Sequence, residues 1–262
     1  MKNIIAANVA NATVTASSES PDYLFSTALI DSRLSRTGRT LSDDSQWVLF
    51  TFAAAVDVDI VGIFGNNFTS AATVKIQANA TDSWGSPSID VEMTYTKNPY
   101  KTIDKGRDVG EWTHQFSSTE SYKYWRISVN DAANPDTYIE MGFVFLDEAI
   151  TFPGMAVNHV IKMNTTSEAS FSDSGQAYGL KRVKYNSLAI SYPAETNAQR
   201  KTVENFFYEV DVVTPYMMLL WESNLDTQRP LYMINTGLPE FQRAENATGV
   251  IWSSSHEVRE VK

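Results

Sequence analysis

Cysteine is absent from the 262 residues of this chain. Disulfide bonds, thiolate metal sites and cysteine nucleophiles are therefore excluded. No apolar run approaches the ~20 residues that a membrane-spanning helix needs, so membrane insertion is not expected. The apolar stretch within Met1–Ala7 is too short for a signal peptide.

Basic residues are few, with 21 Lys and Arg against 31 Asp and Glu and a net charge of −10. Arg33, Arg36 and Arg39 form the densest basic group. Nucleic-acid binding depends on clustered positive charge, so a nucleic-acid partner is not expected. The apolar fraction of 43% is that of a globular protein, and the length suits one large domain or two modest ones.

Catalytic signatures are also missing, including those of nucleophile elbows, phosphate-binding loops, dinucleotide-binding folds and zinc proteases. The histidines His114, His159 and His256 are far apart, and we interpret them as surface or interface residues. We therefore expect no enzyme activity, no cofactor and no metal site. A pair of carboxylates at the separation used by glycosidases stays open, because sequence does not show distances.

The stretch Tyr122–Leu146 gives the clearest strand pattern in the first half of the chain, with two predicted strands joined by a turn. Side chains alternate between two faces, with Trp125, Ile127 and Val129 on one and Tyr124, Arg126 and Ser128 on the other. A polar turn follows, and then a second strand is predicted. Its residues Ile139, Met141, Phe143 and Phe145 are expected on one face.

Further strands are predicted over residues 4–16, 46–52, 58–64 and 74–78, the last half-exposed. Residues 79–110 form a long, polar segment rich in turn residues, which is typical of a functional loop or of a loop covered by a partner. Residues 91–95 within this segment fit a short strand.

The strands carrying Trp47 and Trp125-Arg126-Ile127, followed by Ile139-Glu140-Met141-Gly142, resemble discoidin-like, galactose-binding-like domains. The resemblance implies a jelly-roll β-sandwich over residues 1–148. The family's usual Asp-Gly is here Asp31-Ser32, which leaves open whether a calcium ion is bound near Asp31.

Such sandwiches bind ligands through loops at one end, using aromatic faces and a few hydrogen-bonding side chains. The resemblance therefore implies candidate glycan-binding residues in the long loop, with Tyr23 as a candidate neighbour. They are Trp84, Tyr100, Arg107 and Trp112. The alternative is that these aromatics pack under the loop or against a neighbouring subunit.

Residues 149–262 predict a smaller β-domain with one packed helix. Thr196 and Gln199 fit a capping box, and Val203, Phe206, Phe207 and Val210 share one face of a helix near 197–210. Strands are expected at 160–164, 216–221, 231–236 and 256–261, with a hairpin or surface loop over 165–178. A change of alternation predicts a turn or bulge near Asn186-Ser187. The whole chain is thus expected to be mainly β.

The second half also resembles distal-tail and baseplate-hub proteins of tailed bacteriophages. The resemblance lies in Ile190-Ser191-Tyr192, Glu204-Asn205-Phe206-Phe207, Pro215–Leu220, Arg229–Tyr232 and the charged strand His256–Lys262. It implies a structural component of a virion tail tip, made in the host cytoplasm. There it would form a ring of identical subunits, bind other tail proteins and could contact host-surface glycans. The alternative is a carbohydrate-binding adhesin or accessory module.

Overall fold

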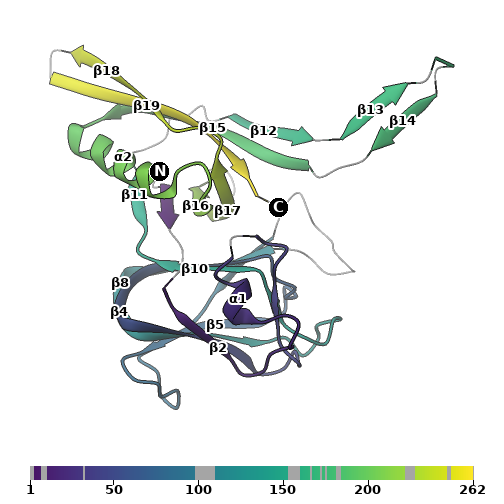
Figure 1. Cartoon of the computed structure of the whole chain (residues 1–262). Helices are drawn as coiled ribbons and strands as arrows, with labels where there is room; N and C mark the ends of the chain where they lie inside the picture. Colours follow the sequence, from purple (N-terminus) through teal and green to yellow (C-terminus); the bar gives the residue numbers. More distant parts are fainter. Residues whose placement is uncertain are drawn as a thin grey trace. The chain divides into compact units, whose positions relative to one another are not determined.

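The computed structural model describes most of the chain. The described residues are 3–6, 11–31, 33–97, 110–152, 160–165, 167–171, 173–174, 176–180, 184–221, 228–246 and 249–261. Antiparallel strands dominate (Figure 1), which confirms the predicted mainly β class. The chain divides into two compact units, here called the sandwich unit and the helix unit. The sandwich unit comprises Ile4–Ile150 and Leu219–Pro230, and the helix unit comprises Met1–Asn3, Thr151–Met218 and Leu231–Lys262.

The sandwich unit contains a seven-stranded sheet in the order β10-β4-β8-β5-β6, with β2 added on β4 and β7 added on β8. A separate short pair is formed by β3 (Gly38–Arg39) and β9 (Glu140–Met141). The seven strands are β2 (Thr13–Ala16), β4 (Gln46–Phe64), β5 (Thr73–Asn79), β6 (Ile89–Glu92), β7 (Thr94–Lys97), β8 (Gly110–Asn130) and β10 (Phe143–Asp147).

Strands β4 and β8 are long, and their pairing shifts register between Thr51 and Val56 and again between Val58 and Ile60. Such bulges bend a strand pair without ending it. The strands predicted over 46–52 and 58–64 are therefore two halves of one strand. Side chains from both halves, Phe50 and Ile63 among them, belong to the same hydrophobic core.

The predicted alternation along β8 is confirmed. Trp125, Ile127 and Val129 are buried in the core. Tyr124, Arg126 and Ser128 on the other face are half-exposed. The indole of Trp125 also donates a hydrogen bond from Nε1 to the carbonyl oxygen of Tyr122 at 3.0 Å, which satisfies its one polar atom.

The prediction of one continuous face from Ile139 to Phe145 is wrong, because the phase changes at Gly142. Ile139 and Met141 before it join the core, and so do Val144 and Leu146 after it. The rings of Phe143 and Phe145 instead meet edge to face with centroids 4.9 Å apart, and the ring of Phe145 meets that of Phe64 edge to face at 5.7 Å. At Gly142 a Cβ would lie 3.0 Å from the carbonyl oxygen of Leu34, a tight contact that a side chain would form only if the backbone of Leu34 moved slightly away.

An eight-stranded sheet has the order β11-β1-β16-β17-β19-β15-β12, with β18 paired to β19. The opening strand expected over 4–16 is in fact two strands, since β1 joins this sheet and β2 the other. The strands are β1 (Asn3–Ala6), β11 (Ile150–Phe152), β12 (Val160–Thr165), β15 (Lys184–Glu195), β16 (Tyr216–Trp221), β17 (Gln228–Asn235), β18 (Glu240–Asn246) and β19 (Gly249–Glu260).

Helix α2 (Asn197–Val210) matches its prediction. Thr196 and Gln199 form the reciprocal capping box, and the predicted apolar face is buried. The bulge predicted at Asn186-Ser187 is wrong, because β15 pairs there without interruption; the register shifts between Tyr192 and Glu195 instead.

Strands β13 (Glu168–Phe171) and β14 (Ala177–Leu180) form the predicted hairpin. Among the described residues they pair only with each other and join neither large sheet (Figure 1). No helix in the described ranges is long and apolar enough to cross a membrane.

Candidate functional site

Two of the four predicted loop residues, Trp84 and Trp112, lie within the described residues. Tyr100 and Arg107 lie outside the described residues. Trp112 lies on β8 and is only 3% exposed, with its ring against Tyr95 at 5.3 Å and Phe68 at 6.4 Å. A buried indole contributes to packing, so Trp112 has no surface to offer a glycan. Of the four, Trp84 remains as a described, partly exposed residue.

Trp84 lies in the loop between β5 and β6, and two contacts fix its indole. Nε1 donates a hydrogen bond to Oδ1 of Asp82 at 2.7 Å. The guanidinium carbon of Arg126 lies 4.3 Å from the ring centroid, in cation–π range. The loop is itself held by Asn79, whose side-chain amide donates to the carbonyl oxygen of Ser83 at 2.7 Å. The indole is thus oriented before any ligand arrives.

Arg126 is positioned by a row of residues across the sheet. Gln77 on β5 lies opposite Arg126 on β8 and opposite Asp90 on β6, so the three side chains share one face. Arg126 Nε donates to Gln77 Oε1 at 2.7 Å, and Gln77 Nε2 donates to Asp90 Oδ1 at 3.1 Å. Lys75 adds an ion pair to Asp90 at 3.3 Å.

This row explains why β5 is more buried than its sequence predicts. Gln77 was expected to be half-exposed but is 8% exposed, because Arg126 and Asp90 bind its amide. Burial lowers the pKa of Arg126, and the carboxylates of Asp90 and Asp82 act in the opposite direction. Among the described residues, the terminal nitrogens of Arg126 have no hydrogen-bond acceptor, which leaves them for a ligand.

The same face extends along neighbouring rows. Ser128 lies opposite Trp47 on one side and Lys75 on the other, and Lys75 lies opposite Glu92. Tyr124 lies opposite Asn79 in the row beyond Arg126. Trp47 and Tyr124 are both half-exposed. The face therefore alternates aromatic rings with hydrogen-bonding groups. We call it the Trp84–Arg126 face.

Hydrogen bonds of polar side chains, to one another and to backbone groups, hold the loops that follow β4 and β8 together. Asp131 accepts hydrogen bonds from the backbone and hydroxyl of Thr69 at 2.8 and 2.6 Å and from the amide of Asn134 at 3.0 Å. Asn67 donates to the carbonyl oxygen of Tyr138 at 2.9 Å. Asn67, Asp131 and Asn134 are all buried, so their polar atoms serve the fold.

A second feature lies beside the short helix α1 (Phe25–Ala28). Phe25 and Leu29 are buried there, while Tyr23 is 39% exposed. A hollow of about 340 Å³ opens next to the helix, within the size range of ligand pockets. Its polar and aromatic lining consists of Asp22, Tyr23, Thr27, Ser35, Arg36 and Thr37. We call it the α1 cleft.

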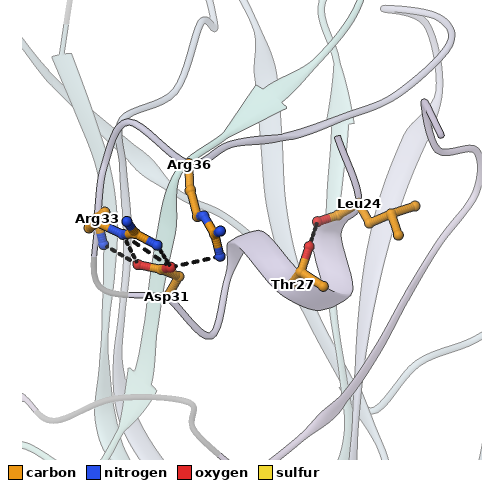
Figure 2. Close-up of polar contacts among 5 residues, drawn as sticks. All are labelled: Leu24, Thr27, Asp31, Arg33 and Arg36. Atoms are coloured by element: carbon orange, nitrogen blue, oxygen red, sulfur yellow. Dashed lines mark hydrogen bonds and ion pairs between the residues drawn. The ribbon is translucent and has the colours of Figure 1, made fainter. Parts of the chain in front are cut away.

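The carboxylate of Asp31 next to this cleft is occupied by arginines (Figure 2). Arg33 Nη2 lies 2.6 Å and Arg36 Nη1 3.0 Å from Asp31 Oδ2. The hydrogen bond from Arg33 holds the pKa of Asp31 well below its usual range. Glu140 is likewise paired with Arg39 at 3.0 Å. No cluster of three metal-ligating side chains occurs within the described ranges.

The two described histidines, His114 and His256, belong to no metal-binding cluster of described residues. His256 was expected at a surface or interface but is buried, stacked on Tyr192 at 5.9 Å and against Phe207 at 4.6 Å. His114 is half-buried beside Phe116, and His159 lies outside the described residues.

Comparison with known proteins gives likeness to solved structures only; no family model and no curated protein matches the chain. Chitosan-binding module 1 of a chitosanase/glucanase from Paenibacillus sp. IK-5 is 20% identical, covering 54% of this chain and 98% of its own, with a TM-score of 0.39. The family 32 carbohydrate-binding module of C. perfringens NanJ, in complex with galactose, is 15% identical. The match covers 55% of this chain and 98% of that module, with a TM-score of 0.40. The lectin domain of lectinolysin is 12% identical, and the match covers 55% of this chain and 97% of that domain, with a TM-score of 0.38.

Proposed function

We propose that the sandwich unit binds carbohydrate through the Trp84–Arg126 face. The observation that carries the proposal is the fixed stack of Arg126 on Trp84. Asp82 holds the indole at 2.7 Å and Gln77 holds the guanidinium at 2.7 Å, so both partners are oriented in advance. Preorganised groups lose less entropy when a ligand binds.

The chemistry of the face suits a neutral sugar. The apolar C–H face of a pyranose packs on a partly exposed aromatic ring such as Trp84 or Tyr124. Its hydroxyls would accept hydrogen bonds from the terminal nitrogens of Arg126 and donate to the carboxylate of Asp90. A hydrogen bond to a charged group is stronger than one between two neutral groups, so these contacts would both orient the sugar and raise its affinity.

The test is calorimetric titration of the full chain with galacto- and gluco-oligosaccharides. Trp84→Ala should weaken binding about tenfold or more, the equivalent of ~1.4 kcal/mol. Arg126→Lys keeps the charge but loses the planar guanidinium fork with its paired N–H donors, and should also weaken binding. Tyr208→Ala is the control, since Tyr208 is 83% exposed in the helix unit. Unchanged affinity in Trp84→Ala would remove this face as the site.

We infer a second candidate function, a non-enzymatic structural role in a phage tail tip, as a ring of identical subunits that contacts other tail proteins. The β13–β14 hairpin favours it. An isolated two-stranded hairpin is marginally stable in water, and within the described residues this one pairs with no further strand. A neighbouring subunit would supply a further strand, through a heterologous contact of the kind that closes rings.

Light scattering on the full chain tests this role. We expect an oligomer larger than a dimer that becomes monomeric when residues 168–180 are replaced by a short Gly-Ser linker. Sugar titration of the same variant separates the two functions, because the Trp84–Arg126 face is untouched. A monomeric wild-type chain, alone and with tail proteins, would contradict the ring.

A further inference from the structure

The α1 cleft carries a feature that the proposed function does not use. Arg33 and Arg36 both bind the carboxylate of Asp31, whose side chain is 17% exposed while theirs are 62% and 57% exposed. Two guanidinium groups share one carboxylate, so the cluster of Asp31, Arg33 and Arg36 keeps one positive charge, and the carboxylate of Asp22 lies in the lining of the same cleft. The arginines are nevertheless held in place, because Asp31 accepts from both.

Arg36 is the member of this cluster that lines the cleft. Figure 2 shows its guanidinium between Asp31 and helix α1. Nη1 is used for Asp31 at 3.0 Å. Within the described part of the chain, Nε and Nη2 of Arg36 have no acceptor, and they supply two parallel donors of the geometry that a carboxylate accepts.

The remaining lining offers partners for hydroxyl groups and for an apolar face. Asp22 supplies an acceptor, and Ser35 and Thr37 supply hydroxyls. Tyr23 is 39% exposed at the cleft, and the guanidinium carbon of Arg39 lies 3.8 Å from its ring centroid. That stack fixes the ring, as the Arg126 stack fixes Trp84.

We propose that the α1 cleft is a second saccharide-binding site, selective for an acidic sugar. The sugar carboxylate pairs with Arg36, its hydroxyls pair with Asp22, Ser35 and Thr37, and its ring packs beside Tyr23. The inference shares the ligand class of the proposed function but uses separate residues. Asp22 makes the cleft unfavourable for a bare multivalent anion, because its carboxylate repels the charge of the ligand and receives no hydrogen bond from a ligand without hydroxyl donors.

The experiment titrates the full chain with oligogalacturonate and, in parallel, with the same oligomer fully methyl-esterified. We expect the acid to bind and the ester to bind at least about tenfold more weakly, because esterification removes the charge that Arg36 pairs with. Affinity should fall as salt is raised. Equal affinity for acid and ester, or no binding of the acid, would overturn the proposal.

Variants locate the site. Arg36→Gln should lower affinity for oligogalacturonate at least about tenfold, and Arg36→Lys should recover part of it because the charge returns without the fork. Asp22→Ala should weaken both oligomers together, since it removes a hydroxyl acceptor. Wild-type affinity in Arg36→Gln would overturn the proposal, and melting curves confirm that each variant is folded.

Failure of this site is distinguishable from failure of the Trp84–Arg126 face. Trp84→Ala should leave oligogalacturonate binding intact while neutral oligosaccharide binding falls. Arg36→Gln should show the opposite pattern. If Trp84→Ala alone abolishes oligogalacturonate binding, the acid binds at the sheet face and the α1 cleft is not a site.

Discussion

The ring of Phe206 meets that of Tyr216 edge to face, with centroids 5.2 Å apart and planes at 88°. Phe206 is 2% exposed and Tyr216 fully buried, so the contact fixes helix α2 on the strand β16. Phe206→Ala should lower the free energy of unfolding by ~3–5 kcal/mol, because it leaves a cavity under the helix. Chemical denaturation followed by circular dichroism measures it.

The matched control is Tyr208→Ala on the same helix. Tyr208 is 83% exposed, so its removal should change the free energy of unfolding by no more than ~0.5 kcal/mol. Equal losses in the two variants would mean that α2 is not packed on the side that the structure assigns.

The pH dependence of stability should report His256. Burial lowers its pKa from 6.5 to about 4, and neither ring nitrogen has a hydrogen-bond partner among the described residues. The folded state therefore holds His256 neutral, while the unfolded state takes up a proton below pH 6.5. Stability should be level above pH 7 and fall by about 3 kcal/mol as pH drops from 6.5 toward 4.

Because burial also lowers the pKa of His114, the wild-type curve alone does not isolate His256. His256→Phe removes the titrating group and keeps an aromatic ring against Tyr192 and Phe207. Its unfolding free energy should lose most of this acid dependence. A variant with the same slope as the wild type would show that other groups cause the loss.

What the sequence predicted well depends on neighbours along the chain. The capping box of Thr196 and Gln199 and the buried face of α2 are set within a few residues, and both are observed. The alternation of Trp125, Ile127 and Val129 is equally local. Period and capping chemistry suffice for such elements.

What the sequence missed depends on contacts between distant segments. The phase changes at Gly142, where the backbone lies close to that of Leu34, more than a hundred positions earlier. The partners of Arg126 follow from register, since Gln77 and Asp90 are its neighbours only after β5 and β6 have paired. Trp112 was taken for a loop residue, although it continues the strand that carries Trp125.

The N-terminal cap of α2 should contribute measurably to stability. Thr196 Oγ1 accepts from the backbone N–H of Gln199 at 3.2 Å, and Gln199 Oε1 accepts from the backbone N–H of Thr196 at 2.8 Å. Thr196→Ala removes the first bond and should cost ~1 kcal/mol in unfolding free energy. Thr202→Ala, an exposed mid-helix position, is the control and should be neutral or slightly stabilising. Equal effects would show that the cap is frayed.

The last prediction concerns calcium, which sequence resemblance left open near Asp31. In the structure Arg33 and Arg36 bind both oxygens of that carboxylate, and Arg39 lies 3.0 Å from Glu140. A divalent cation would have to displace these guanidinium groups and face their repulsion. A ligand that binds the folded state raises the melting temperature with its concentration. We therefore expect the melting temperature of the full chain to be the same in EDTA and in millimolar calcium.

The double variant Arg33→Ala/Arg36→Ala, which frees the Asp31 carboxylate, is the matched comparison. A calcium-dependent rise in the wild type would show that the arginines yield to the ion and that the cluster is a metal site.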